Sequence, residues 1–362
     1  MNQQQVITEL QSRGLNLVSD GVGASGRKGG AGPSDHKAVT VGGTTVMVPV
    51  FTEGAAQSPF VVKRDRNTGS SVLLKEKEVI APISFPTQPK FYGLETAEGV
   101  PYWKIALLHS RNVLATTVLQ NCIRYDNRKT ACQFCAISQS LEAGRTIAKK
   151  TPAQLAEVAE AAVRLDGVEH MIMTTGTPNV TDRGAAYLME CAQAIRNRVF
   201  LPIQAQCEPP DDFVWFDRLR AAGVDSLGMH LEAADPMVRS RIMPGKARVP
   251  LTYYYRAFEA AVKVFGRGQV STYLLAGLGD SKETLLEMCD RLIALGVYPF
   301  VVPFVPIVGT PLAGQSPPDS DFMFQLYQAI GSRLKQANLR SADMKAGCGK
   351  CGACSALSTF EG

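Results

Sequence analysis

The chain of 362 residues contains no apolar run that approaches the roughly 20 residues needed to span a membrane. Its start, MNQQQVITELQSRG, also lacks the basic and then apolar order of a secretion signal. The charge excess is small, because 38 Lys and Arg against 33 Asp and Glu leave a net charge of +5. This balance gives no sign of a nucleic-acid surface. We therefore expect a cytoplasmic protein that binds neither membrane nor nucleic acid.

The composition also lacks the biases of unusual protein classes. With 45% hydrophobic and 20% charged residues it argues against a disordered chain, a collagen-like repeat and a disulfide-dense miniprotein. At about 150 residues per domain, the length allows two small domains or one barrel-sized domain with extensions. The nine cysteines are not expected to form disulfides in a reducing compartment. Their clustering therefore indicates metal ligation or reactivity.

Residues 1–105 predict a β-rich N-terminal extension without a catalytic constellation. Short apolar stretches at 37–41, 44–50 and 59–62 are separated by glycine and asparagine turns. The glycine-rich loop at 27–35, RKGGAGPSD, could present consecutive backbone N–H groups to an anion, or it could be a flexible turn.

Residues 106–315 predict a parallel β/α architecture, because short apolar strands alternate with long amphipathic helices. Thr151 and Ser281 are the expected caps of two of these helices. Six strands are expected, at 113–117, 171–174, 203–207, 226–231, 270–275 and 300–303. Six parallel strands can form an open sheet or a partial barrel, and in both cases ligands gather at the carboxyl ends of the strands.

A loop directly after the first of these strands carries a chemical motif. Cys122, Cys132 and Cys135 form C-x9-C-x2-C, and three thiolates can hold three irons of a [4Fe-4S] cluster while the fourth iron stays open. An open iron can bind S-adenosylmethionine (SAM) and deliver one electron to its sulfonium, which gives methionine and a 5′-deoxyadenosyl radical. The alternative is a zinc site, for which four ligands are usual and no histidine stands close by in the sequence.

With this motif the sequence resembles the radical SAM superfamily over residues 105–315. The usual motif there is C-x3-C-x2-C with an aromatic residue before the last cysteine, a place that Phe134 occupies here. The nine-residue gap departs from that motif but is a variant known in the superfamily. The resemblance implies an α/β fold with a partial (β/α)6 barrel of the TIM type, a [4Fe-4S] cluster with an open iron, and SAM.

The resemblance also implies residues that contact SAM. The turn after the second predicted strand matches the position that binds the methionine amino group, and it comprises Thr174, Thr175, Gly176 and Thr177. Glu232 and a later arginine resemble the Glu and Arg that hold SAM in the biotin synthase and hydrogenase-maturase branch. Of the arginines at 239, 241 and 248 we favour Arg248. Gly277 and Gly279 resemble the glycine turn beside adenine.

The third predicted strand ends in Gln206, Cys207 and Glu208, and its register decides which of them faces the barrel mouth. Cys207 is interpreted as a buried structural thiol, because the companion cysteines of a sulfur-donating cluster are not at matching positions. His170 and His230 flank strands and receive no assigned role.

Residues 316–362 predict a helix over 319–337 and a cysteine-rich tail. Cys348, Cys351 and Cys354 form C-x2-C-x2-C, and glycines at 347, 349 and 352 allow the backbone to wrap around a compact inorganic core. We expect an auxiliary Fe–S cluster there, with zinc or a disordered tail as the alternatives.

Together these features predict a radical SAM enzyme that abstracts hydrogen from a small-molecule substrate and receives electrons from a reductant such as flavodoxin or ferredoxin. The auxiliary cluster would aid sulfur insertion, or a rearrangement or fragmentation. The loop at 27–35, the C-x9-C-x2-C loop and the tail together resemble a radical SAM family of nitrilase-linked bacterial gene clusters. The alternative is an Fe–S electron-transfer or scaffold protein without SAM chemistry.

Overall fold

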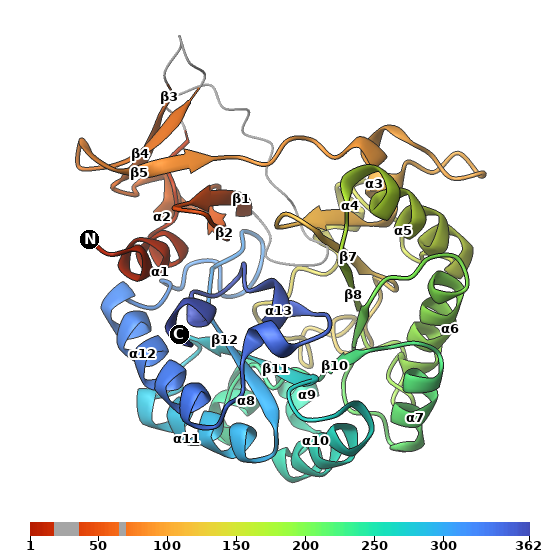
Figure 1. Cartoon of the computed structure of the whole chain (residues 1–362). Coiled ribbons are helices and arrows are strands. Elements are labelled where there is room, and N and C mark those ends of the chain that lie inside the picture. The colour runs from red at the N-terminus through yellow and green to blue at the C-terminus, as the bar shows by residue number, and fades with distance from the viewer. Residues whose placement is uncertain (18–35, 65–69) are drawn as a thin grey trace.

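A curled sheet of seven strands forms the centre of the fold (Figure 1). The computed structural model describes residues 1–17, 36–64 and 70–362, so the glycine-rich loop at 27–35 lies outside the described residues. The strand order is β12-β11-β10-β9-β8-β7-β6. Each strand from β7 to β12 runs parallel to its neighbours within this group. The six parallel strands are β7 (Val113–Thr117), β8 (His170–Thr174), β9 (Ile203–Gln206), β10 (Ser226–Gly228), β11 (Val270–Ala276) and β12 (Val297–Pro303). The predicted partial (β/α)6 barrel is therefore confirmed.

One strand of this sheet was not predicted. β6 (Leu107–His109) pairs with β7 in the antiparallel direction and forms the edge of the sheet. A three-residue strand is too short to show an alternating apolar pattern, which explains why it was not predicted. Its position matters for the site, because His109 at its end lies at the edge of the barrel interior.

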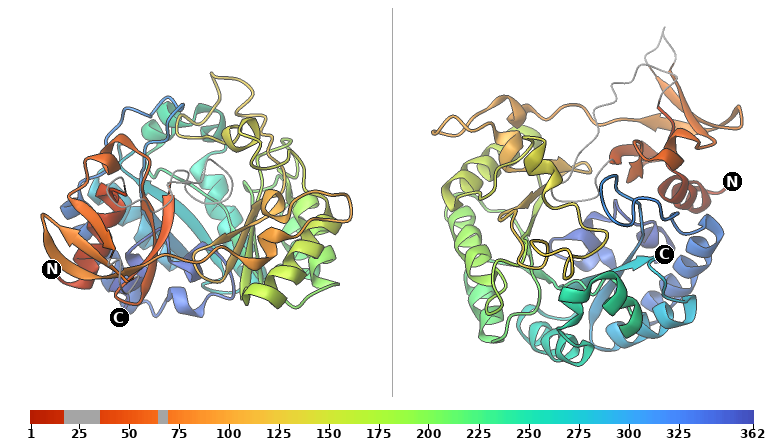
Figure 2. Two further views of the ribbon diagram at one scale, coloured as in Figure 1. Left: turned by 90° about the horizontal axis from the view of Figure 1, so that it is seen from above. Right: turned by 180° about the vertical axis from the view of Figure 1, so that it is seen from behind.

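Long helices surround the sheet (Figures 1 and 2). The Thr151 hydroxyl accepts a hydrogen bond from Gln154 N at the start of one helix, and Ser281 caps another in the same way, so both predicted caps are confirmed. The helices of the outer layer are α5 (Pro152–Asp166), α6 (Ala185–Arg196), α7 (Val214–Ala221), α10 (Leu251–Phe265), α11 (Lys282–Ala294) and α12 (Ser320–Gln336). Three short helices lie in the connections, namely α4 (Gln139–Glu142), α8 (Pro236–Ile242) and α9 (Pro244–Ala247).

The N-terminal part contains an antiparallel sheet of five strands in the order β2-β1-β5-β4-β3. Three of its strands overlap the three predicted stretches. The strands are β1 (His36–Val41), β2 (Thr44–Pro49), β3 (Phe60–Arg64), β4 (Ser71–Lys75) and β5 (Glu78–Ser84). The helical elements of this part, none of which was predicted, are α1 (Gln3–Arg13), α2 (Glu53–Ala56), η1 (Lys90–Gly93) and α3 (Tyr102–Ile105).

The C-terminal tail enters the barrel at the amino ends of its strands, and Figure 1 shows α13 inside the ring of helices. Gly347 N donates to His170 Nδ1 at 3.3 Å, and Cys348 N donates to Gln204 Oε1 at 3.1 Å. Both acceptors lie near the starts of their strands. The elements of the tail are η2 (Ser341–Asp343), α13 (Cys348–Cys351) and η3 (Leu357–Phe360). The tail is therefore ordered against the barrel.

The N-terminal part packs on the same tail. The Ala353 carbonyl accepts hydrogen bonds from Met47 N at 2.7 Å and from Gln11 Nε2 at 3.0 Å. One hydrophobic core contains buried residues of the N-terminal sheet, the barrel and the tail. The loop between the second and third tail cysteines is thus held from the N-terminal side as well as from the barrel.

Gly331 in α12 packs closely against η3 of the tail, and substitution of this glycine probes that contact. We expect Gly331→Ala to destabilise the protein by about 1–3 kcal/mol, because overpacking costs this much. An added Cβ at Gly331 would stand 2.3 Å from the Phe360 carbonyl oxygen. Glycine to alanine normally stabilises a helix by up to about 1 kcal/mol, so the sign of the effect is diagnostic. Urea denaturation measures it.

The matched control is Gly54→Ala in α2, where an added Cβ meets nothing within 4 Å. This variant should be neutral or more stable than the natural protein. Equal stabilisation by both substitutions would contradict the packing of η3 on α12.

Candidate active site

A cavity of about 430 Å³ lies inside the barrel and connects the two groups of clustered cysteines. Cys122, Cys132 and Cys135 line it at the carboxyl ends of the strands, and Cys348 and Cys354 line it on the side of the tail. The tail is in front in Figure 1, whereas the loop with the first three cysteines is in front in the right panel of Figure 2. The barrel therefore brings both cysteine motifs to one internal space.

The three cysteines of the first motif are partly buried. Burial raises the pKa of Cys132 well above its ordinary value and that of Cys135 to about 11. Binding of a metal cluster would therefore displace protons from these thiols. Within the described residues, no three Cys, His, Asp or Glu side chains converge as the ligands of one metal ion would. A [4Fe-4S] cluster does not need that convergence, because each thiolate binds a different iron.

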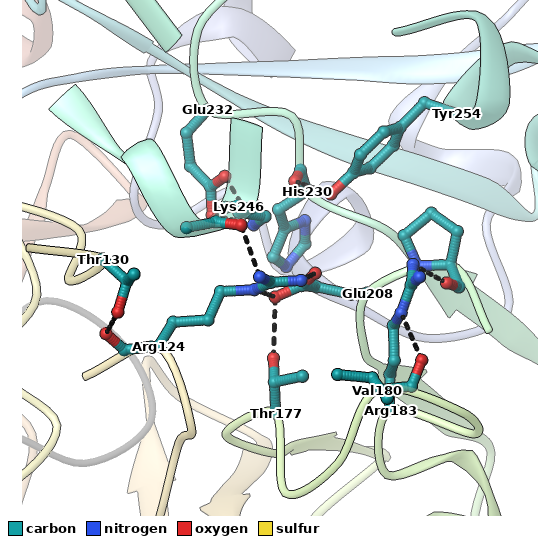
Figure 3. Close-up of polar contacts among 12 residues, drawn as sticks. Arg124, Thr130, Thr177, Val180, Arg183, Glu208, His230, Glu232, Lys246 and Tyr254 are labelled. Atoms are coloured by element: carbon teal, nitrogen blue, oxygen red, sulfur yellow. Dashed lines mark hydrogen bonds and ion pairs between the residues drawn. The ribbon is translucent and has the colours of Figure 1, made fainter. Parts of the chain in front are cut away.

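A buried ion pair anchors the cysteine loop, defined here as residues 118–138, to the barrel (Figure 3). Arg124 Nε and Nη2 donate to the two carboxylate oxygens of Glu208, each at 2.6 Å. Thr177 Oγ1 donates to the same carboxylate at 2.7 Å. Burial opposes ionisation of Glu208, but these hydrogen bonds outweigh it and hold its pKa below the ordinary value. Arg124 also donates to the Gly245 carbonyl, so three segments meet at this guanidinium.

A second buried ion pair lies beside the first. Lys246 Nζ contacts the two Glu232 carboxylate oxygens at 2.7 and 2.5 Å, and both residues line the cavity. Burial disfavours the charged lysine, yet the Glu232 carboxylate raises the pKa of Lys246 above its ordinary value. Arg248, which was predicted to contact SAM, is exposed and does not line the cavity. The cation that faces Glu232 is Lys246.

The predicted turn after β8 does line the cavity. Its members, together with the aromatic residue of the cysteine motif, are Phe134, Thr174, Thr175, Gly176 and Thr177. A Cβ at Gly176 would stand 2.0 Å from the Asn121 carbonyl oxygen, so the cysteine loop and this turn approach closely only because residue 176 is glycine.

The predicted glycine turn after β11 does not line this cavity. Gly277 and Gly279 have φ of 106° and 126°, a region that glycine adopts readily, but they are not among the cavity-lining residues. A Cβ at Gly277 would approach Pro318, and one at Gly279 would meet Arg241. Backbone conformation and close packing thus explain both glycines, and Leu275 and Phe304 line the cavity near them instead.

All three residues at the end of β9, Gln206, Cys207 and Glu208, line the cavity. Burial raises the pKa of the Cys207 thiol to about 12, as suits a buried structural thiol. From the sequence we expected the strand register to select which of these residues faces the barrel mouth. The strand instead ends at Gln206, and the two residues after it follow the cavity wall.

His230 presents a hydrogen-bond donor to the same space. Its Nδ1 accepts a hydrogen bond from Tyr273 N at 3.2 Å, and burial together with Lys246 lowers its pKa to about 3. The ring is therefore neutral with its hydrogen on Nε2. This buried nitrogen has no hydrogen-bond partner among the residues that the structure describes. His230, which had no assigned role, is thus suited to bind a ligand.

Part of the chain matches a known protein family. Residues 127–292 match the family described as the Radical SAM superfamily. The bacteriochlorophyllide c C-7(1)-hydroxylase of Chlorobaculum limnaeum is 29% identical over 226 residues, which are 57% of this chain and 56% of that protein. The lipoyl synthase of Marinobacter nauticus is 25% identical over 177 residues, which are 46% of this chain and 47% of that protein. The chain thus spans about half the length of these curated relatives.

Among solved structures, the crystal structure of methylornithine synthase is similar with a TM-score of 0.48 and 17% sequence identity, over 74% of this chain and 78% of that one. The family match and the curated relatives favour an enzyme over the electron-transfer or scaffold protein that the sequence left open. No helix within residues 1–17, 36–64 and 70–362 is long and apolar enough to cross a membrane.

The Arg124–Glu208 pair can be tested by its effect on stability. We expect Glu208→Gln to lower the free energy of unfolding of the cluster-free protein by about 3–5 kcal/mol, because removal of one partner leaves a buried charge without compensation. The side chains of Arg124 and Glu208 are 11% and 7% exposed. Chemical denaturation measures the change.

A matched control breaks an exposed pair of the same residue types. Glu160→Gln removes the partner of Arg198, and these side chains are 44% and 47% exposed. Its effect should stay below about 1 kcal/mol. Similar losses in both variants would show that the Arg124–Glu208 pair is no more important than a surface contact.

Proposed function

We propose that the chain is a radical SAM enzyme in which Cys122, Cys132 and Cys135 hold the [4Fe-4S] cluster that this superfamily implies. The observation that carries the proposal is that these thiols line one cavity together with the turn after β8 and the Glu232–Lys246 pair. Thiolates are the usual ligands of such clusters, and three of them leave one iron open. When bound, the cluster supplies SAM with the electron that releases a 5′-deoxyadenosyl radical for hydrogen abstraction from substrate.

The polar residues of the cavity support a site for SAM beside the cysteine loop. We assign Glu232 to accept hydrogen bonds from the ribose hydroxyls and Lys246 to contact the methionine carboxylate, a role given to Arg248 from the sequence. The turn of residues 174–177 offers backbone groups to the methionine amino group. His230 would donate its Nε2–H to the bound cofactor or substrate, because this donor is otherwise unpaired among the described residues.

The substrate is a small molecule with an uncharged portion near the middle of the cavity. Between the two cysteine groups the wall is largely apolar, and its side chains include Met47, Ala115, Ile172, Leu275 and Val302. Burial of an unpaired charge against such side chains would be costly. Hydrogen abstraction from carbon is therefore the reaction that this part of the wall supports best.

The tail is assigned an auxiliary Fe–S cluster, held by Cys348, Cys351 and Cys354. Its support is the burial of this segment in the barrel and the access of Cys348 and Cys354 to the cavity. A cluster there would face the substrate from the side opposite SAM. Such a centre would aid sulfur insertion, or a rearrangement or fragmentation, and an external reductant such as flavodoxin or ferredoxin would supply electrons.

The first motif is tested by SAM cleavage. Protein reconstituted anaerobically with iron, sulfide and reductant should form 5′-deoxyadenosine, and Ala at Cys122, Cys132 or Cys135 should reduce this to background, because the cluster would lose a ligand. Cys191→Ala, in the core of α6, is the matched control and should retain cleavage. Full cleavage of SAM by the triple alanine variant would refute the assignment of these cysteines as cluster ligands.

The tail is tested by its iron content. Two [4Fe-4S] clusters would give about 8 irons per chain, and replacing all three tail cysteines by Ala should halve that number. The tail variant should still bind and slowly cleave SAM, whereas formation of the product should fail. Mössbauer spectra compare the two proteins. Identical spectra, or zinc in the tail, would refute the auxiliary cluster, and loss of sulfide in one turnover would favour sulfur insertion.

A further inference from the structure

A side chain of a type that ligates iron lies against the tail cysteines. His109 Nε2 is 3.5 Å from Cys354 Sγ, although 245 positions separate the two residues in the sequence. Only 4% of His109 and 8% of Cys354 is exposed to solvent. Both residues line the cavity, as does Cys348. The tail therefore has a nitrogen donor beside its three sulfur donors.

The β6–β7 hairpin fixes this arrangement. His109 pairs with Val113 at the end of β6, and the next residue, Ser110, has a φ of 59°. A residue other than glycine seldom adopts this left-handed conformation. The Ser110 hydroxyl contacts the Cys351 thiol. Consecutive residues of one tight turn thus contact two of the three tail cysteines.

The other polar neighbours of the tail thiols act as hydrogen-bond donors. Gln206 Nε2 donates to Cys348 Sγ at 3.1 Å, and the Tyr273 hydroxyl donates to the same sulfur. An amide NH₂ and a protonated phenol stabilise a thiolate but offer no good donor atom to iron. An imidazole nitrogen is an established ligand of protein Fe–S clusters. His109 is therefore the neighbour best suited to complete the ligand set.

We propose that His109 is the fourth protein ligand of the cluster held by Cys348, Cys351 and Cys354. This assignment rests on the proposed auxiliary cluster. It leaves no iron of the tail cluster for direct binding of substrate, in contrast to the open iron at the cysteine loop. The tail cluster would then act as an electron carrier or as a source of sulfide.

The test isolates the tail cluster by replacing Cys122, Cys132 and Cys135 with Ala. In this background, ¹⁵N-histidine labelling and pulsed EPR of the reduced protein should show the hyperfine coupling of a directly bound nitrogen. His109→Cys should retain the iron, abolish that coupling and lower the reduction potential, because an anionic thiolate replaces a neutral imidazole. His170→Asn is the matched control, since His170 accepts a hydrogen bond from Gly347 N, and it should retain the coupling.

The outcomes separate the two proposals. A background variant that binds no Fe–S cluster would overturn the auxiliary cluster and the histidine assignment together. A cluster without nitrogen coupling would overturn only the assignment of His109, and this measurement does not depend on any substitution of His109. A coupling that survives in His109→Cys would likewise overturn it.

Discussion

The geometry of the site depends on the buried ion pair between Arg124 and Glu208. The cysteine loop has little regular structure of its own, and this pair joins it to the segment that follows β9. Thr177, in the turn after β8, donates a hydrogen bond to the same Glu208 carboxylate and so connects that turn to the pair. Buried charges must be paired to be tolerated, so the loop has one favoured position on the barrel. Arg124 lies in the gap between Cys122 and Cys132, so the long segment between these cysteines is anchored to the barrel.

The opposite end of the barrel is closed in a different way. An incomplete barrel leaves its interior open at the amino ends of the strands, and here the tail enters it, with backbone hydrogen bonds to Gln204 and His170. The N-terminal part covers the tail through the Ala353 carbonyl. Closure at this end therefore requires segments from both ends of the chain, which explains why one hydrophobic core joins all three parts.

Local patterns predicted the barrel but not the contacts across it. The six parallel strands and the caps at Thr151 and Ser281 depend on neighbouring residues, and both motifs of three cysteines are visible as spacings. α1 was missed because its sequence, QQQVITELQSR, has few apolar residues. Lys246 was missed because α9 is a single turn that buries Lys246 and leaves Arg248 exposed, a difference that no periodicity reveals. The contact of His109 with Cys354 spans most of the chain and has no local signature.

The two ion pairs also decide how a charged cofactor can enter an apolar cavity. The Arg124–Glu208 and Glu232–Lys246 pairs each have no net charge, so neither pair needs a ligand to compensate a buried charge. SAM carries an amino group, a carboxylate and a sulfonium, and the Glu232–Lys246 pair offers one partner of each sign at the cavity wall. The pair thus places a hydrogen-bond donor and an acceptor side by side where polar groups of a bound cofactor could meet them. Much of the remaining wall is apolar, with polar exceptions that include His230, Gln206 and Tyr273, so the cavity offers separate surfaces to charged and uncharged groups.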